Sequence, residues 1–138
     1  MKIREVMTRG VETISPGETL EAAARKMLHR NVGFLPVMEF EKVVGVVTDR
    51  DIVLRAVSAG LPPHMATVRQ VLTKTALAVY EDQTLTDASL KMEQNLVHRL
   101  LVLDRQDRLV GIVSLSDIAA KTKNDRLSGH VLGKVVPA

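Results

Sequence analysis

Apolar residues follow two spacings along the chain, and each spacing occurs twice. Between positions 20 and 28, and again between 85 and 97, they return every three or four residues. That period predicts a helix with one apolar face in each stretch. Each helix is followed by two short runs rich in β-branched residues and separated by a charged turn, which predicts paired strands. The paired runs are Phe34–Met38 with Val43–Thr48, and Leu100–Leu103 with Leu109–Ser114.

A second helix is predicted after each pair of strands. The first begins near Asp49 and runs toward Gly60, a natural stop, and the second begins near Leu115. Thr19 and Thr84 precede the first helix of each half, where a hydroxyl can cap free backbone N–H groups. With a short strand at the start, each half has the order β-α-β-β-α, and the fold class is mixed α/β (α+β).

These elements form an internal repeat. The sequence VGVVTDRDI at 44–52 returns as VGIVSLSDI at 110–118, and the segments that lead into the two halves repeat as well. The leading positions Arg4, Val6 and Thr8 return as Arg69, Val71 and Thr73. We therefore expect repeat 1 at residues 1–62, repeat 2 at 63–124 and a non-repeating tail at 125–138. Because ~60 residues bury little core alone, the two repeats should pack together about a pseudo-twofold axis.

With these residues, the chain resembles tandem CBS-domain proteins, or Bateman modules, over residues 2–122. In repeat 2, VHRLLVLD at 97–104 and GIVSLSDI at 111–118 are similar to the nucleotide-binding repeats of the AMP-activated protein kinase γ subunit. Repeat 1, with FLPV at 34–37 and VTDRDI at 47–52, resembles small stand-alone bacterial CBS-pair proteins. The resemblance implies clefts between the repeats that accept adenosine compounds, a homodimer, and no catalytic chemistry.

Two aspartates are the first candidates for ligand contact. Asp51 and Asp117 each stand at the start of a helix, where a carboxylate can accept two hydrogen bonds from a ribose diol. Thr48, Ser114 and Ser116 add hydroxyls beside the helix N-terminus. The spacing Ser/Thr-x-x-Asp also fits a helix capping box, which contributes to the fold alone. Both roles stay open, and the resemblance favours the ribose contact.

Phosphate contact is predicted for His98 and Arg99, since Arg offers two parallel N–H donors and His one more. A solvent-facing pair at the start of a strand is the alternative. Repeat 1 has Gly33 and Phe34 instead, so only one of the two clefts would be well equipped for phosphate, and Arg50 would compensate in part. By resemblance, the adenine pocket would be apolar, although the same side chains would equally serve as core. Its candidates are Thr13, Ile14, Leu35, Pro36, Val79, Tyr80, Leu100 and Leu101.

Composition narrows the function further. The chain has no cysteine and no run of apolar residues long enough for a membrane span, and its net charge of +3 is dispersed. His29, His64 and His130 show no metal-ligand spacing, and scarce aromatics disfavour nucleic acid. Together with the resemblance, the sequence therefore predicts a cytoplasmic, non-enzymatic regulatory module without a catalytic cofactor. Its expected ligand is AMP in the first place, and ADP or ATP in the second, and its expected partner is a regulated protein that the sequence does not identify. The alternatives are NAD or S-adenosylmethionine as ligand, or a structural dimerisation module.

Overall fold

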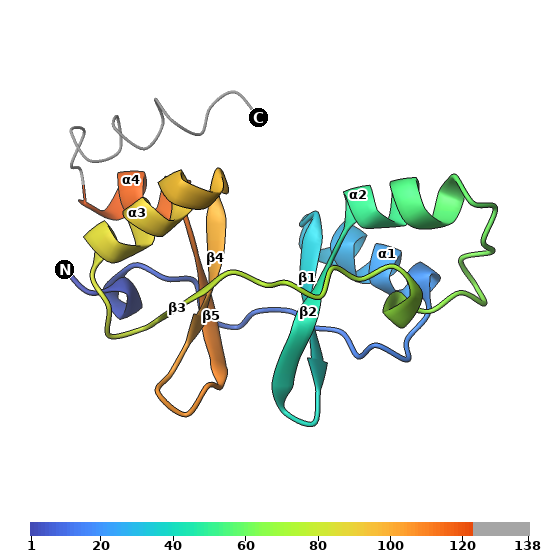
Figure 1. Cartoon of the computed structure of the whole chain (residues 1–138), viewed down its shortest axis with the longest axis horizontal. Helices are drawn as coiled ribbons and strands as arrows, with labels where there is room; N and C mark the ends of the chain where they lie inside the picture. The colour runs from blue at the N-terminus through green and yellow to red at the C-terminus, as the bar shows by residue number, and fades with distance from the viewer. Residues whose placement is uncertain (123–138) are drawn as a thin grey trace. The chain divides into compact units, whose positions relative to one another are not determined.

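Two units make up residues 1–122, the part of the chain that the computed structural model describes (Figure 1). One unit is Glu12–Ala76, and the other joins Met1–Val11 to the residues from Leu77 on. The leading segment of repeat 1 (residues 1–11) thus belongs to the unit built mainly by repeat 2. The leading segment of repeat 2 (residues 63–76) belongs to the unit built mainly by repeat 1. The boundary at 62/63 between the sequence repeats is therefore not the boundary between the packed units. The predicted tail at 125–138 lies outside the described residues.

The 12–76 unit contains the predicted helix, strand, strand and helix. Gly60, at φ +72°, follows the second helix and ends it as predicted. The predicted first strand is reduced here to one parallel bridge between Ile14 and Val37. The elements are α1 (Leu20–Arg30), β1 (Phe34–Glu39), β2 (Lys42–Thr48), α2 (Asp49–Asp51) continuing as the π-helix η2 (Ile52–Val57), and the 3-10 turn η3 (Val68–Gln70).

The other unit repeats this order with a true first strand. Strand β3 lies parallel to β4, and β4 pairs antiparallel with β5. In the 12–76 unit, β1 and β2 pair antiparallel in the equivalent way. The elements are the 3-10 turn η1 (Ile3–Glu5), β3 (Ala78–Tyr80), α3 (Leu85–Asn95), β4 (Arg99–Leu103), β5 (Leu109–Ser114) and α4 (Leu115–Thr122).

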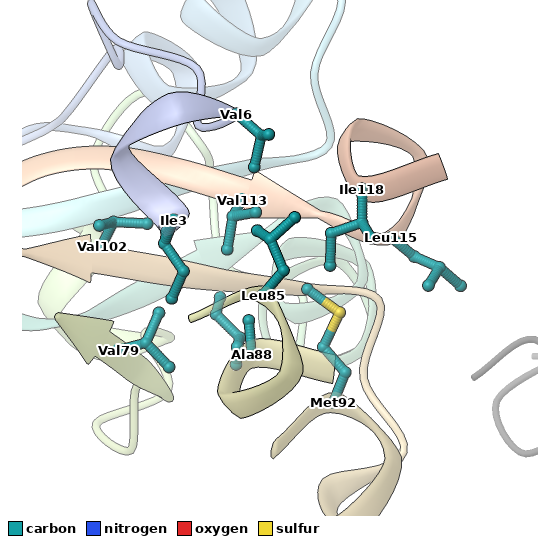
Figure 2. Close-up of a cluster of buried hydrophobic side chains, with 11 residues drawn as sticks. Ile3, Val6, Val79, Leu85, Ala88, Met92, Val102, Val113, Leu115 and Ile118 are labelled. Atoms are coloured by element: carbon teal, nitrogen blue, oxygen red, sulfur yellow. The ribbon is translucent and has the colours of Figure 1, made fainter. Parts of the chain in front are cut away.

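Each unit encloses its own aliphatic core, and each core includes residues from an exchanged leading segment. Ile3 and Val6 point into the same cluster as Leu85 and Val113 (Figure 2). Val68 and Val71 contribute likewise to the core of the 12–76 unit. Ile3 and Val68 are both fully buried. The leading segments are therefore integral parts of the two cores.

Two glycines allow the leading segments to lie against the sheets. Thr73 exchanges backbone hydrogen bonds with Val46 at 2.9 and 2.8 Å, and a Cβ at Gly45 would collide with the Thr73 carbonyl oxygen. A Cβ at Gly111 would come within 2.8 Å of the Thr8 carbonyl oxygen. Both glycines are thus required by close backbone approach.

The helix ends also follow the sequence. Thr19 Oγ1 accepts from the Ala22 N–H at 3.1 Å, and Thr84 caps α3 in the same way. The first long helix of each unit ends in the left-handed conformation, at Asn31 and at Leu96. These units of sheet and helix confirm the predicted mixed α/β fold. Among the described helices, none is long and apolar enough to cross a membrane.

Candidate functional site

The candidate ribose-binding aspartates both sit in reciprocal capping boxes. In the 12–76 unit, the Thr48 N–H donates to Asp51 Oδ2 and the Asp51 N–H donates to Thr48 Oγ1, each at 3.0 Å. In the other unit, Ser114 N–H donates to Asp117 Oδ2 at 2.9 Å and Asp117 N–H to Ser114 Oγ at 3.0 Å. The capping role anticipated from the spacing is confirmed. It occupies one oxygen of each carboxylate and leaves the other for a second role.

The second oxygen of Asp51 is already engaged. Asp51 is 8% exposed, and its Oδ1 accepts a hydrogen bond from the Thr73 hydroxyl at 3.1 Å. The guanidinium of Arg55 lies 3.7 Å from the same oxygen. Neither Thr73 nor Arg55 was a predicted site residue. The repeat of Thr8 at Thr73 was visible in the sequence, but no local pattern connects Thr73 to Asp51.

The second oxygen of Asp117 has a different environment. Asp117 is half-buried, and no side chain within the described residues donates to its Oδ1. Ser116 lies exposed beside it, with its hydroxyl 3.0 Å from the hydroxyl of Ser114. At the N-terminus of α4, one carboxylate oxygen and two hydroxyls thus stand together, which is the donor and acceptor set that a vicinal diol requires.

The predicted phosphate-binding pair lies at the same end of this sheet. Arg99 is opposite Ser114 in the β4–β5 register, and the His98 carbonyl accepts from the Leu115 N–H at 2.8 Å. His98 Nε2 is buried, and no residue of the described chain hydrogen-bonds to it. The structure therefore brings His98, Arg99, Ser114 and Asp117 to one strand-to-helix junction.

The equivalent junction of the 12–76 unit has Gly33 in place of this imidazole. The Gly33 carbonyl accepts from the Asp49 N–H at 2.9 Å, the counterpart of the His98 contact. A Cβ on Gly33 would come within 2.9 Å of Asp49 Oδ2, so the aspartate occupies the room of a side chain. Arg50, the predicted substitute for phosphate contact, is exposed one residue before Asp51.

Half of the predicted adenine-pocket residues lie in the hydrophobic cores. Their side chains pack with the buried clusters, so the core alternative describes these four: Ile14, Leu35, Val79 and Leu100. Pro36 and Leu101 are also buried, but they alternate with core residues along β1 and β4 and so face the other side of each strand. Thr13 is half-buried, and its carbonyl accepts from Lys26 Nζ at 2.8 Å.

Tyr80 has its own partners near the β4–β5 hairpin. The Arg105 guanidinium lies 4.2 Å from the ring centroid, and the Tyr80 hydroxyl donates to Asp107 Oδ1 at 2.9 Å. This hydrogen bond raises the pKa of Tyr80 above its usual value. Tyr80 pairs with Leu103 at one end of β4, whereas Asp117 follows Ser114, which pairs with Arg99 at the other end. Tyr80 and the junction at Asp117 are therefore roughly 13 Å apart along β4.

A shallow apolar groove lies between the helices of the 12–76 unit. It is lined chiefly by α1 and by the first turns of the second helix, and two of its side chains, Leu28 and Val53, are more than half exposed. Leu28 is 84% exposed, and Val57, further along the second helix, is 63% exposed. The lining residues are Ala24, Met27, Leu28, Val32, Asp49, Ile52 and Val53. An exposed apolar helix face of this kind marks an interaction surface.

Comparison with known proteins gives the family. The CBS domain model matches residues 3–58 and 68–123. The chain is 35% identical over 133 residues to the CBS domain-containing protein YhcV of Bacillus subtilis, covering 96% of this chain and 94% of that protein. It is 36% identical over 117 residues to Hypoxic response protein 1 of Mycobacterium tuberculosis, covering 84% and 81%. The chain belongs to the CBS domain family and carries a tandem CBS pair, as the repeat indicated.

Solved structures agree with this assignment. The crystal structure of Hypoxic Response Protein I with two coordinated zinc ions matches with a TM-score of 0.78 and 34% identity, covering 88% of this chain and 98% of that one. A CBS domain pair in complex with 5′-methylthioadenosine and S-adenosyl-L-methionine matches with a TM-score of 0.75 and 22% identity, covering 91% and 98%. In the described part of this chain, no three His, Cys, Asp or Glu side chains gather as a metal site.

Proposed function

We propose that the protein is a cytoplasmic, non-catalytic regulatory module that binds an adenosine compound, with the ribose held at the junction of β5 and α4. The observation that carries this proposal is the carboxylate oxygen Oδ1 of Asp117, to which no side chain of residues 1–120 donates and which stands beside Ser114 and Ser116 at a helix N-terminus. A ribose diol would donate two hydrogen bonds to it. The structural neighbour that binds 5′-methylthioadenosine and S-adenosyl-L-methionine supports this class of ligand.

The phosphate or other polar group of the ligand would be held by the same edge of the sheet. His98 brings a buried nitrogen that has no hydrogen-bond partner among residues 1–120, and such a group is costly unless a ligand or water satisfies it. Arg99 adds a permanent positive charge. AMP, ADP and ATP carry the phosphates that such a pair recognises, whereas S-adenosylmethionine does not, so the pair favours a nucleotide.

Calorimetry on the complete chain with AMP, ATP, NAD and S-adenosylmethionine tests the proposal. Asp117→Asn is the informative variant, because its amide oxygen still caps Ser114 while its amide nitrogen cannot accept from a ribose. Asp87→Asn, in the exposed capping box of α3, is the matched control. We expect binding to the wild type and to Asp87→Asn, and a loss of at least tenfold in Asp117→Asn. Binding to none of the ligands at millimolar concentration would refute the proposal.

The exposed groove favours a second candidate function, that of a homodimerisation module. Leu28, Val53 and Leu54 are each more than half exposed on α1 and on the second helix of the 12–76 unit. A twofold dimer presents the same patch from both copies, so one apolar face covers the other. Light scattering of the wild type and of Leu28→Glu tests this: the wild type should have the mass of a dimer and the variant that of a monomer. A monomeric wild type would rule it out.

A further inference from the structure

The carboxylate of Asp51 is engaged from three directions. One oxygen caps the Thr48 N–H, and the other accepts the Thr73 hydroxyl and faces the Arg55 guanidinium. Only 8% of the residue is exposed. A ribose could bind to this carboxylate only after the Thr73 hydroxyl and the guanidinium had been displaced from it, which would leave those donors to find other acceptors.

The same three residues fasten the leading segment of repeat 2. Thr73 is held by two backbone hydrogen bonds to Val46. Arg55 also donates to the carbonyl oxygens of Val71 and Leu72, at 2.9 and 3.2 Å. Arg55 and Asp51 both belong to the second helix of the 12–76 unit. Their contacts therefore hold that helix against residues 71–73 of the leading segment.

The other unit has the same backbone arrangement without the side-chain contact. Thr8 exchanges backbone hydrogen bonds with Ile112 at 2.8 and 3.0 Å, in the register that Thr73 has with Val46. Among the side chains of residues 1–120, the Asp117 carboxylate accepts no hydrogen bond, and the bond that the structure gives it comes from the Ser114 backbone N–H. The two junctions therefore share a scaffold, and among the side chains of residues 1–120 they differ in whether the second carboxylate oxygen is engaged.

We propose that Asp51 is a latch for the leading segment of repeat 2, and that Thr73 and Arg55 close the first junction to ribose, so that one chain binds one adenosine ligand, at Asp117. The latch stands on the contacts of the 12–76 unit alone. The count of one ligand per chain rests in addition on the proposed function. Thr73 and Arg55 then determine how many ligands the module binds, although neither contacts the ligand.

The latch is tested without ligand, by thermal unfolding of a double-mutant cycle. Thr73→Val should lower the Tm by about 3 °C in the wild type, since it removes one hydrogen bond to a buried carboxylate. It should have no such effect in the Asp51→Ala background, because the partner is already gone. The matched cycle of Thr8→Val with Asp117→Ala should be additive. Equal effects of Thr73→Val with and without Asp51 would overturn the latch.

The ligand count is tested by calorimetric titration with AMP and with S-adenosylmethionine. The wild type should bind one ligand per chain and Asp117→Asn none, whereas Thr73→Val combined with Arg55→Gln should gain a second site. Two ligands per wild-type chain, with one lost in Asp51→Asn, would overturn the closure of the first junction. If no protein binds either ligand, the proposed function and the ligand count both fail, while the unfolding cycle still decides the latch.

Discussion

Ile3 gives the sharpest test of the exchanged segments. It belongs to the sequence of repeat 1, yet it is fully buried in the core of the unit that repeat 2 builds, beside Val102 and Val113. Ile3→Ala removes a fully buried branched side chain from that core. Such truncations cost about 3 kcal/mol, because the lost burial is accompanied by a cavity that relaxes only in part. The substitution should therefore destabilise the unit that contains β3, β4 and β5, although Ile3 lies in the sequence of repeat 1.

The expected shift in Tm follows from the size of the chain. With about 2.1 cal/mol/K of unfolding entropy per residue, 138 residues give roughly 0.29 kcal/mol/K, so 3 kcal/mol corresponds to about 10 °C if the units unfold together. If the affected unit unfolds alone, with about half of the entropy, the shift approaches 20 °C. Phe40→Ala, at a side chain that is 91% exposed, should change the Tm by no more than about 2 °C.

Hydrogen exchange locates the damage. In Ile3→Ala, the amides of α3 and β5 should lose protection while those of α1 keep theirs. Val68→Ala is the reciprocal variant, because Val68 is fully buried in the core of the 12–76 unit, and it should expose α1 instead. Faster exchange in α1 rather than α3 after Ile3→Ala would refute the exchange of leading segments between the units.

Three further outcomes follow from the structure. Gly45→Ala should cost about 1–3 kcal/mol in urea unfolding, because its Cβ meets the Thr73 carbonyl, whereas Gly17→Ala, with open space around it, should cost almost nothing. Leu96→Asn should raise the Tm by about 2 °C, since Leu96 is 67% exposed and holds a left-handed conformation that asparagine adopts more readily. Tyr80 is the one tyrosine of the chain, so ultraviolet absorbance follows its ionisation, and Asp107→Asn should lower its pKa toward 10. The stability that this raised pKa provides is present below pH 10 and lost as the pH rises through the folded-state value.

The helices, strands and helix caps could be predicted from the sequence because the features that define them are local. The helical spacing, the Thr19 and Thr84 caps and the stop at Gly60 involve residues within a few positions of one another, and all are confirmed. The capping boxes at Asp51 and Asp117 were visible for the same reason, since donor and acceptor are three residues apart.

The candidate site was less accessible because its differences depend on contacts between distant positions. Thr73 contacts Asp51 only because the leading segment of repeat 2 packs on the sheet of repeat 1. No spacing in the sequence predicts that packing. Likewise, strand alternation placed Leu35 and Leu100 in the cores, where the resemblance had suggested a pocket. The two repeats thus share the Ser/Thr-x-x-Asp spacing, although the surroundings of the two aspartates differ.

The exchange of leading segments also bears on the order of folding. Ile3 and Val113 meet in one core, although about 110 residues separate them, and closing a loop of that length costs entropy that grows by about 0.6 kcal/mol for each doubling. Residues 12–76 are contiguous, so they can fold first as the chain leaves the ribosome. In that unit, the bridges at Ile14 and Thr73 lie on the outer sides of β1 and β2, three strand spacings or roughly 14 Å apart. Once the 12–76 unit has folded, the N-terminal segment and the chain beyond residue 77 extend from points on the same sheet. The loop that must close to bring Ile3 to Val113 is then much shorter than 110 residues. Folding of the 12–76 unit therefore lowers the entropy cost of folding the other unit.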